Sequence, residues 1–98
     1  MARKIIWTKR ANKRINQIIE YLEDEFGKNT TKSFVSKTCQ LIDLISQNPH
    51  LGTMENLDKN IRGFLLTKHN RVFYRVTESE IIILNFFDTR THPKNPKF

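Results

Sequence analysis

Residues 71–88 read RVFYRVTESEIIILNFFD and decide the fold of this chain. Their first half alternates apolar with polar residues, which is the period of a half-buried β-strand. Glu78-Ser79 is a two-residue polar turn, and residues 80–88 beyond it form a strand that is apolar on both faces, as expected near the centre of a sheet. The faces of the first strand are predicted to carry Val72, Tyr74 and Val76 on one side and Arg71, Phe73, Arg75 and Thr77 on the other.

Patterns elsewhere in the chain supply the remaining elements. Thr8 is placed to cap a helix whose apolar residues recur every three or four positions until Gly27, a residue type that commonly ends helices. A second helix, which Thr30 or Thr31 can cap, ends at Asn48-Pro49 because the residue before a proline disfavours helical geometry. The full prediction is a strand at 4–8, helices at 9–26 and about 31–47, a polar connection at 50–60, strands at 62–68, 71–77 and 80–88, and a basic tail at 89–98.

These elements predict a single α+β domain spanning residues 1–98, with a strand and a two-helix hairpin packed on a mainly antiparallel sheet. Leu41 and Ile45 should lie on the buried side of the second helix. The face of the sheet away from the helices should be open and should carry arginines. Function is therefore expected on that face.

The charge of the chain points to an anionic partner. Lys and Arg number 17 against 10 Asp and Glu, which gives a formal net charge of +7. An excess of this size in a short chain favours nucleic acid, an acidic protein segment or an anionic membrane surface over neutral partners. No apolar run approaches the ~20 residues that span a membrane, and the single cysteine, Cys39, leaves no intramolecular disulfide.

A set of basic side chains on or beside the open face is the candidate site. Basic groups beside exposed aromatic rings suit RNA, because arginine binds phosphate and a ring stacks on an unpaired base. The alternative is a solvated face that an acidic partner covers. Widely spaced histidines and the lack of a glycine-rich loop predict no metal and no cofactor. The basic candidates are Arg62, Lys68, His69, Arg71, Arg75, Arg90 and His92, with Phe73 and Phe64 between them.

The order of the elements and one motif resemble the RelE/ParE superfamily of toxins from type II toxin–antitoxin systems. The motif is arginine, any residue, an aromatic, tyrosine, any residue and valine, followed by an aliphatic strand. Here it is residues 71–76 followed by 81–84, with Ile61-Arg62 upstream. The resemblance covers most of the chain. It implies a growth-inhibiting toxin that is neutralised by a cognate acidic antitoxin, a partly disordered segment that folds onto the toxin.

One branch of the superfamily consists of ribosome-dependent mRNA endonucleases that act without metal. Resemblance to this branch implies that Arg71 stabilises charge on the phosphate and that Arg62 and Arg90 assist. Those enzymes usually carry a tyrosine or a His-Tyr pair close to the C-terminus, whereas this chain has no tyrosine after Tyr74. The residues that could then move protons are His92 and His69.

The other branch resembles ParE, which poisons DNA gyrase and needs a binding surface instead of an acid–base pair. The missing terminal tyrosine and the apolar Phe86-Phe87 end favour this branch. We therefore predict a gyrase poison, with mRNA cleavage as the alternative and a non-toxic antitoxin-binding module as a further one. The chain is expected to work in the cytoplasm, as a dimer or as a toxin–antitoxin hetero-oligomer. The expected contacts with a partner or nucleic acid are Lys68, His69, Phe73, Arg75 and Phe87.

Overall fold

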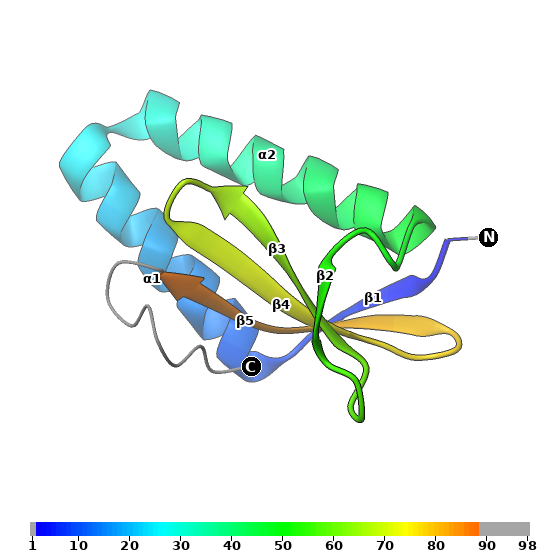
Figure 1. The fold of residues 1–98 in the computed structure, drawn as a ribbon. Coiled ribbons are helices and arrows are strands. Elements are labelled where there is room, and N and C mark those ends of the chain that lie inside the picture. The colour runs from blue at the N-terminus through cyan, green and yellow to red at the C-terminus, as the bar shows by residue number, and fades with distance from the viewer. Residues whose placement is uncertain (1, 89–98) are drawn as a thin grey trace.

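The computed structural model describes residues 2–88, which form two helices and a five-stranded sheet (Figure 1). The elements are β1 (Lys4–Trp7), α1 (Lys9–Phe26), α2 (Lys28–Gln47), β2 (Thr53–Asn56), β3 (Ile61–Thr67), β4 (Asn70–Val76) and β5 (Glu80–Asp88). The strand order is β1-β5-β4-β3-β2, and β1 pairs parallel with β5 while the other neighbours are antiparallel. The predicted α+β architecture is therefore confirmed.

The two helices begin and end where local chemistry allows. Thr8 caps α1 as predicted, because its Oγ1 accepts a hydrogen bond from the Ala11 N–H at 3.1 Å. Gly27 ends α1 with φ 87°, a value that favours glycine. The prediction that α2 begins near Thr31 is wrong: α2 begins at Lys28, and Thr31 Oγ1 donates to the Gly27 carbonyl at 2.9 Å. One glycine reverses the chain, so no further linker is needed.

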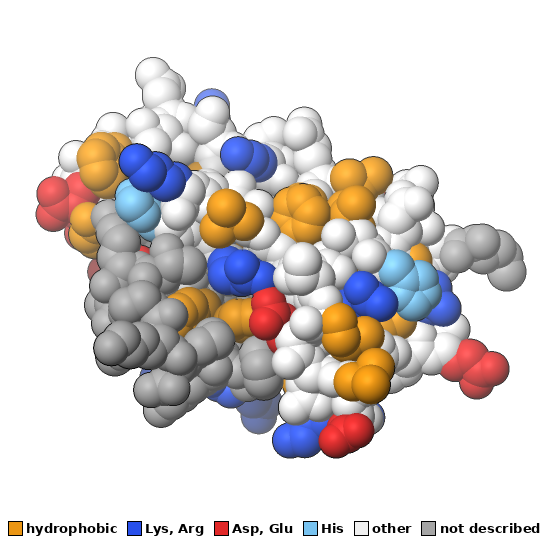
Figure 2. Space-filling model, in the orientation of Figure 1, with side chains coloured by type: hydrophobic (Ala, Val, Ile, Leu, Met, Phe, Trp, Pro, Cys, Tyr) orange, Lys and Arg blue, Asp and Glu red, His pale blue; other side chains and the backbone are white. Residues whose placement is uncertain are grey.

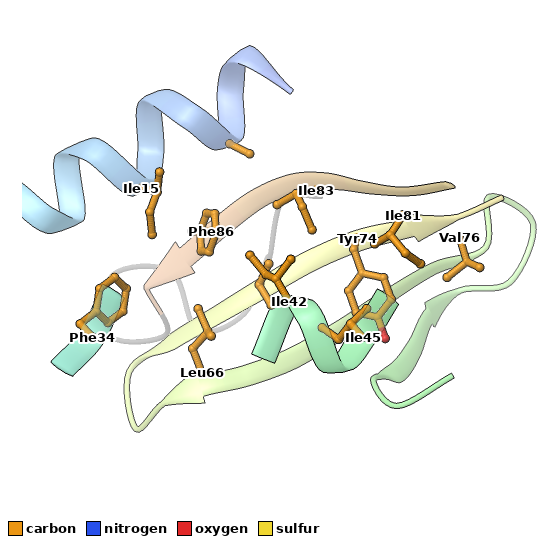
Figure 3. Packing of buried hydrophobic residues seen from close by; sticks show 12 residues of the cluster. Ile15, Phe34, Ile42, Ile45, Leu66, Tyr74, Val76, Ile81, Ile83 and Phe86 are labelled. Atoms are coloured by element: carbon orange, nitrogen blue, oxygen red, sulfur yellow. The ribbon is translucent and has the colours of Figure 1, made fainter. Parts of the chain in front are cut away.

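The main core lies between the helix pair and one face of the sheet (Figure 3). Val72, Tyr74 and Val76 of β4 all point into it, as their alternation predicts. Ile45 of α2 is fully buried, whereas Leu41 is only partly buried where it packs against the cluster. Figure 3 shows residues from both helices and from β3, β4 and β5 converging on this layer: Ile15, Phe34, Ile42, Ile45, Leu66, Tyr74, Val76, Ile81, Ile83 and Phe86.

A β-bulge changes which residues of β5 face the helices. Simple alternation places Phe86 on the opposite face from Ile81 and Ile83. The register between β4 and β5 shifts between Phe73 and Tyr74, so β5 carries an extra residue there. Phe86 therefore joins Ile81 and Ile83 in the main core, and Phe87 turns to the other face. Simple alternation therefore fails for these two phenylalanines.

The stretch interpreted as a polar connection contains a strand. β2 pairs with β3 through Thr53 opposite Gly63 and Met54 opposite Arg62, and the register then shifts before Asn56. β2 is short, half-exposed and polar, so it has no alternation that a sequence pattern could reveal. Its position at the sheet edge is decided by pairing with β3.

Candidate functional site

The face of the sheet away from the helices is partly apolar and buried. Ile61, Phe73 and Phe87 form a second cluster there, and Leu84 packs against it. The Phe73 and Phe87 ring centroids lie 6.2 Å apart. Phe73 is fully buried, so the expectation that it is an exposed stacking ring is wrong. Phe64 packs against the main core on the helix side, so it does not lie between the arginines either.

Arg71 is held by neighbours on this face. Its Nη2 donates to Glu55 Oε1 at 2.5 Å and to Thr53 Oγ1 at 3.2 Å. Its guanidinium carbon lies 5.8 Å from the centre of the Phe73 ring, within reach of a cation–π interaction. The carboxylate comes from β2, so the sequence analysis had no strand on which to place it. Arg71 is thus a paired arginine with 30 % of its side chain exposed.

Arg62 lies on the other face. It sits directly opposite Tyr74 in the β3–β4 pairing, and opposite residues share a face. Its Nη1 donates to the carbonyls of Gly52 at 2.8 Å and His50 at 3.3 Å. Among the described residues its buried Nε has no hydrogen-bond partner. The expectation that Arg62 joins Arg71 on one face is therefore wrong.

Tyr74 anchors the same connection between α2 and β2. Its hydroxyl accepts from the Gly52 N–H at 2.8 Å and donates to the Pro49 carbonyl at 3.0 Å. Burial raises the pKa of Tyr74, while the Gly52 N–H and the positive charge of Arg62 oppose that rise. Tyr74 and Arg62 together fix the backbone from Pro49 to Gly52. Their roles here are structural.

The other candidate residues are spread over the surface. Arg75 is exposed on β4, and Lys68 and His69 occupy the turn between β3 and β4. Arg90 and His92 lie outside the described residues. The structure therefore brings Arg71, Phe73 and Phe87 together on one face, and it separates Arg62 from them. The residues that sequence reasoning missed are Glu55 and Thr53.

An open groove of about 1100 Å³ lies between the helices and the β3–β4 turn. Its apolar lining includes Ile18, Leu22 and Phe34, and Arg14 and Lys37 add positive charge. Tyr21 and Phe26 also line the groove, and their rings form an edge-to-face pair although both are exposed. A groove with aromatic and arginine side chains has the composition of a protein-binding surface.

Hydrophobic side chains also reach the surface where α2 meets the sheet. Figure 2 shows them there, with lysine or arginine side chains on either side. In the described part of the chain, no helix is both long and apolar enough to cross a membrane.

The same fold occurs in solved structures of low sequence identity. It is shared with the chromosomal ParDE TA system from P. aeruginosa (TM-score 0.74, 19% identity, 89% of this chain and 96% of that chain). It is also shared with the YoeB/ParE toxin from Agrobacterium tumefaciens (TM-score 0.61, 18% identity, 87% and 96%). The E. coli DinJ-YafQ toxin-antitoxin complex matches with TM-score 0.63 and 11% identity, over 94% and 98%.

The family follows from the sequence match. A family model described as the ParE toxin of type II toxin-antitoxin system, parDE, matches residues 5–93. The chain belongs to this family of type II toxins. Comparison with curated proteins gave no significant match.

Proposed function

We propose that this toxin acts by binding and poisoning DNA gyrase and that it does not cleave mRNA. The observation that carries the proposal is the ion pair between Arg71 and Glu55. A catalytic arginine must aim its N–H groups at the charge that develops on the phosphate. Here a carboxylate occupies one of those groups, and a phosphate in the same place would be repelled by it. Cleavage would first have to break this pair.

The positions of the two arginines support the same proposal. A nuclease of the kind that the resemblance implied would need Arg62 and Arg71 near one phosphate. Arg62 is instead bound to the carbonyls of Gly52 and His50 on the helix side of the sheet. Side chains on opposite faces of a sheet cannot converge on one small group. This arrangement favours a surface that binds a macromolecule.

The groove between the helices and the β3–β4 turn is the proposed surface for the target. Tyrosine and arginine are the side chains that most often dominate binding energy at interfaces, and Tyr21 and Arg14 both line this groove. Tyr21 is half-exposed, so a partner could bury it on binding. The exposed aromatic and arginine side chains of the groove have the composition of a protein interface, and this supports a protein target.

The proposed neutralising partner is an acidic antitoxin in the cytoplasm. The net charge of +7 favours an acidic segment. Solved neighbours of similar fold include the DinJ-YafQ complex and a heterotetrameric YoeB-YefM complex from Staphylococcus aureus, both toxin-antitoxin complexes. By analogy we propose a toxin–antitoxin hetero-oligomer for this chain.

Induced expression without antitoxin tests the proposal. Cells should stop growing and should accumulate gyrase-dependent DNA breaks, while primer extension should find no new ribosome-dependent mRNA ends. The purified toxin should trap gyrase on DNA in the presence of ATP. New mRNA ends without DNA breaks would establish the nuclease alternative. Normal growth at high expression would leave a non-toxic antitoxin-binding module.

A further inference from the structure

Within residues 2–88, half of the outer edge of β3 has no strand beside it. β2 covers this edge only at Ile61, Arg62 and Gly63. Among the described residues, none forms a strand pairing with the outer edge from Phe64 to Thr67. A free edge exposes backbone N–H and C=O groups, and these groups select an extended chain as their partner.

An apolar hollow lies beside that free edge. It has a volume of about 280 Å³ and is bounded by α2 on one side and β3 on the other. Leu44 of α2 and Leu65 of β3 line it, and they are 46% and 50% exposed. Figure 2 shows hydrophobic side chains at the surface where α2 meets the sheet. The lining residues are Lys37, Gln40, Leu41, Leu44, Phe64, Leu65 and Leu66.

Two kinds of partner could pair with this edge, a second copy of this chain or an acidic segment, and charge favours the acidic segment. The charged side chain among the described lining residues is Lys37, and Lys68 follows β3 in the adjoining turn. A second copy of this chain would bring another net charge of +7 to the same place, which opposes self-pairing. An acidic segment is attracted by the same charges.

We propose that Phe64–Thr67 is the docking edge for an extended acidic segment of a partner protein. The segment adds a strand to the outer edge of β3, in line with β2, places apolar side chains in the hollow between Leu44 and Leu65, and directs carboxylates toward Lys37. The inference rests on the antitoxin partnership proposed above and identifies the surface for it. The hollow adjoins the large groove beside α1, because Lys37 and Gln40 line both, so a segment bound here lies next to the proposed target surface.

A synthetic peptide tests this surface without any assay of toxicity. The probe is a fluorescein-labelled peptide of about ten residues in which valine alternates with glutamate, since alternate residues of a strand share one face. It should bind saturably in fluorescence anisotropy and should slow amide hydrogen exchange within residues 64–67. A peptide with lysine in place of glutamate should not bind. Equal binding of both peptides, or protection confined to other residues, would overturn the proposal.

Backbone methylation of the probe tests strand pairing directly. N-methylation of one set of alternate residues should abolish binding, whereas methylation of the other set should be tolerated, because only alternate N–H groups face the neighbouring strand. Equal damage from both sets would indicate a helical ligand and would overturn the proposal.

Variants of the protein test the hollow. Leu44→Ser and Leu65→Ser should each weaken peptide binding by about tenfold, through loss of apolar contact. Leu57→Ser is the matched control, because Leu57 is 78% exposed and lies outside the hollow, and it should change binding by less than about twofold. Unchanged binding in both hollow variants would contradict the proposal. So would self-association of the protein alone that either hollow variant abolishes.

The docking-edge proposal and the gyrase proposal can be refuted independently of each other. Failure of the peptide to bind would refute the docking edge and would leave the gyrase proposal intact. Absence of gyrase-dependent breaks with normal peptide binding would refute the target and would leave the docking edge intact.

Discussion

Arg71 and Glu55 form an ion pair although their strands are not neighbours. The Nη2 of Arg71 on β4 lies 2.5 Å from Oε1 of Glu55 on β2, and β3 runs between the two strands. The pair crosses β3 at Gly63. A Cβ at Gly63 would lie 2.8 Å from the Glu55 oxygen and 2.9 Å from the Arg71 nitrogen. The absence of a side chain at this position is what lets the two charged groups meet.

Gly63→Ala should therefore separate Arg71 from Glu55. The added methyl group also meets the Phe73 ring at 3.0 Å, so the neighbours must shift. We expect a loss of about 1–3 kcal/mol in the free energy of unfolding, the usual range for overpacking, as measured by urea denaturation. In a Glu55→Gln background the same substitution should cost less, because the pair is already weakened. Equal costs in both backgrounds would show that the pair contributes nothing.

Arg71→Ala and Glu55→Gln together separate the two target classes. In a gyrase poison, Arg71→Ala should lower toxicity by less than about tenfold, since interface contacts act gradually. In a nuclease it should lower cleavage by about 10²–10³, and Glu55→Gln should raise activity by freeing the guanidinium. Growth after graded induction gives the measurement, and antitoxin binding confirms that the variants are folded. We expect the gradual outcome.

Tyr74→Phe should destabilise the fold in a pH-dependent way. The variant leaves the Gly52 N–H and the Pro49 carbonyl buried without their partner, which costs about 1–3 kcal/mol near neutral pH. The folded state raises the pKa of Tyr74 above 10.0, so the unfolded chain ionises first. The stabilisation is thus complete below pH 10.0 and is lost as the pH rises through the folded pKa. Urea denaturation at increasing pH should show the gap between wild type and variant closing above this value.

Alanine substitutions at three apolar positions of α2 should lower the free energy of unfolding in the order of how deeply each side chain is buried. Ile45→Ala should cost about 2–5 kcal/mol, because Ile45 is fully buried in the main core. Leu41→Ala should cost less, because Leu41 is only partly buried. Leu44→Ala, at a side chain 46% exposed, is the control and should cost less than about 1 kcal/mol. Chemical denaturation measures all three, and a reversed order would mean that the helix face is assigned wrongly.

Antitoxin affinity should fall as salt is added. The chain carries a net charge of +7, and salt screens contacts between exposed charges over about 8–10 Å. Binding constants measured from low to high salt should show a steady weakening, mainly through slower association. An affinity that is flat across the series would contradict a charge-driven partnership.

Local sequence patterns were enough to predict most of the helices and strands. The alternation of Val72, Tyr74 and Val76 placed the right residues in the core, and Thr8 and Gly27 mark the ends of α1. These features depend on neighbours one to four positions away, so a sequence contains them directly. The predicted beginning of α2 was wrong because Gly27 alone makes the turn between the helices, which leaves Thr31 inside α2.

Which residues of the candidate site lie together could be learned only from the tertiary structure. Sequence could indicate an arginine-rich strand, but it could not show that Arg71 is paired with Glu55 or that Arg62 lies on the opposite face. Both facts depend on β2, a polar edge strand whose position comes from pairing with β3. The bulge that buries Phe86 on one face and Phe87 on the other likewise arises between two strands. Contacts between segments distant in the chain leave no periodic pattern, so they appear only when the strands pair.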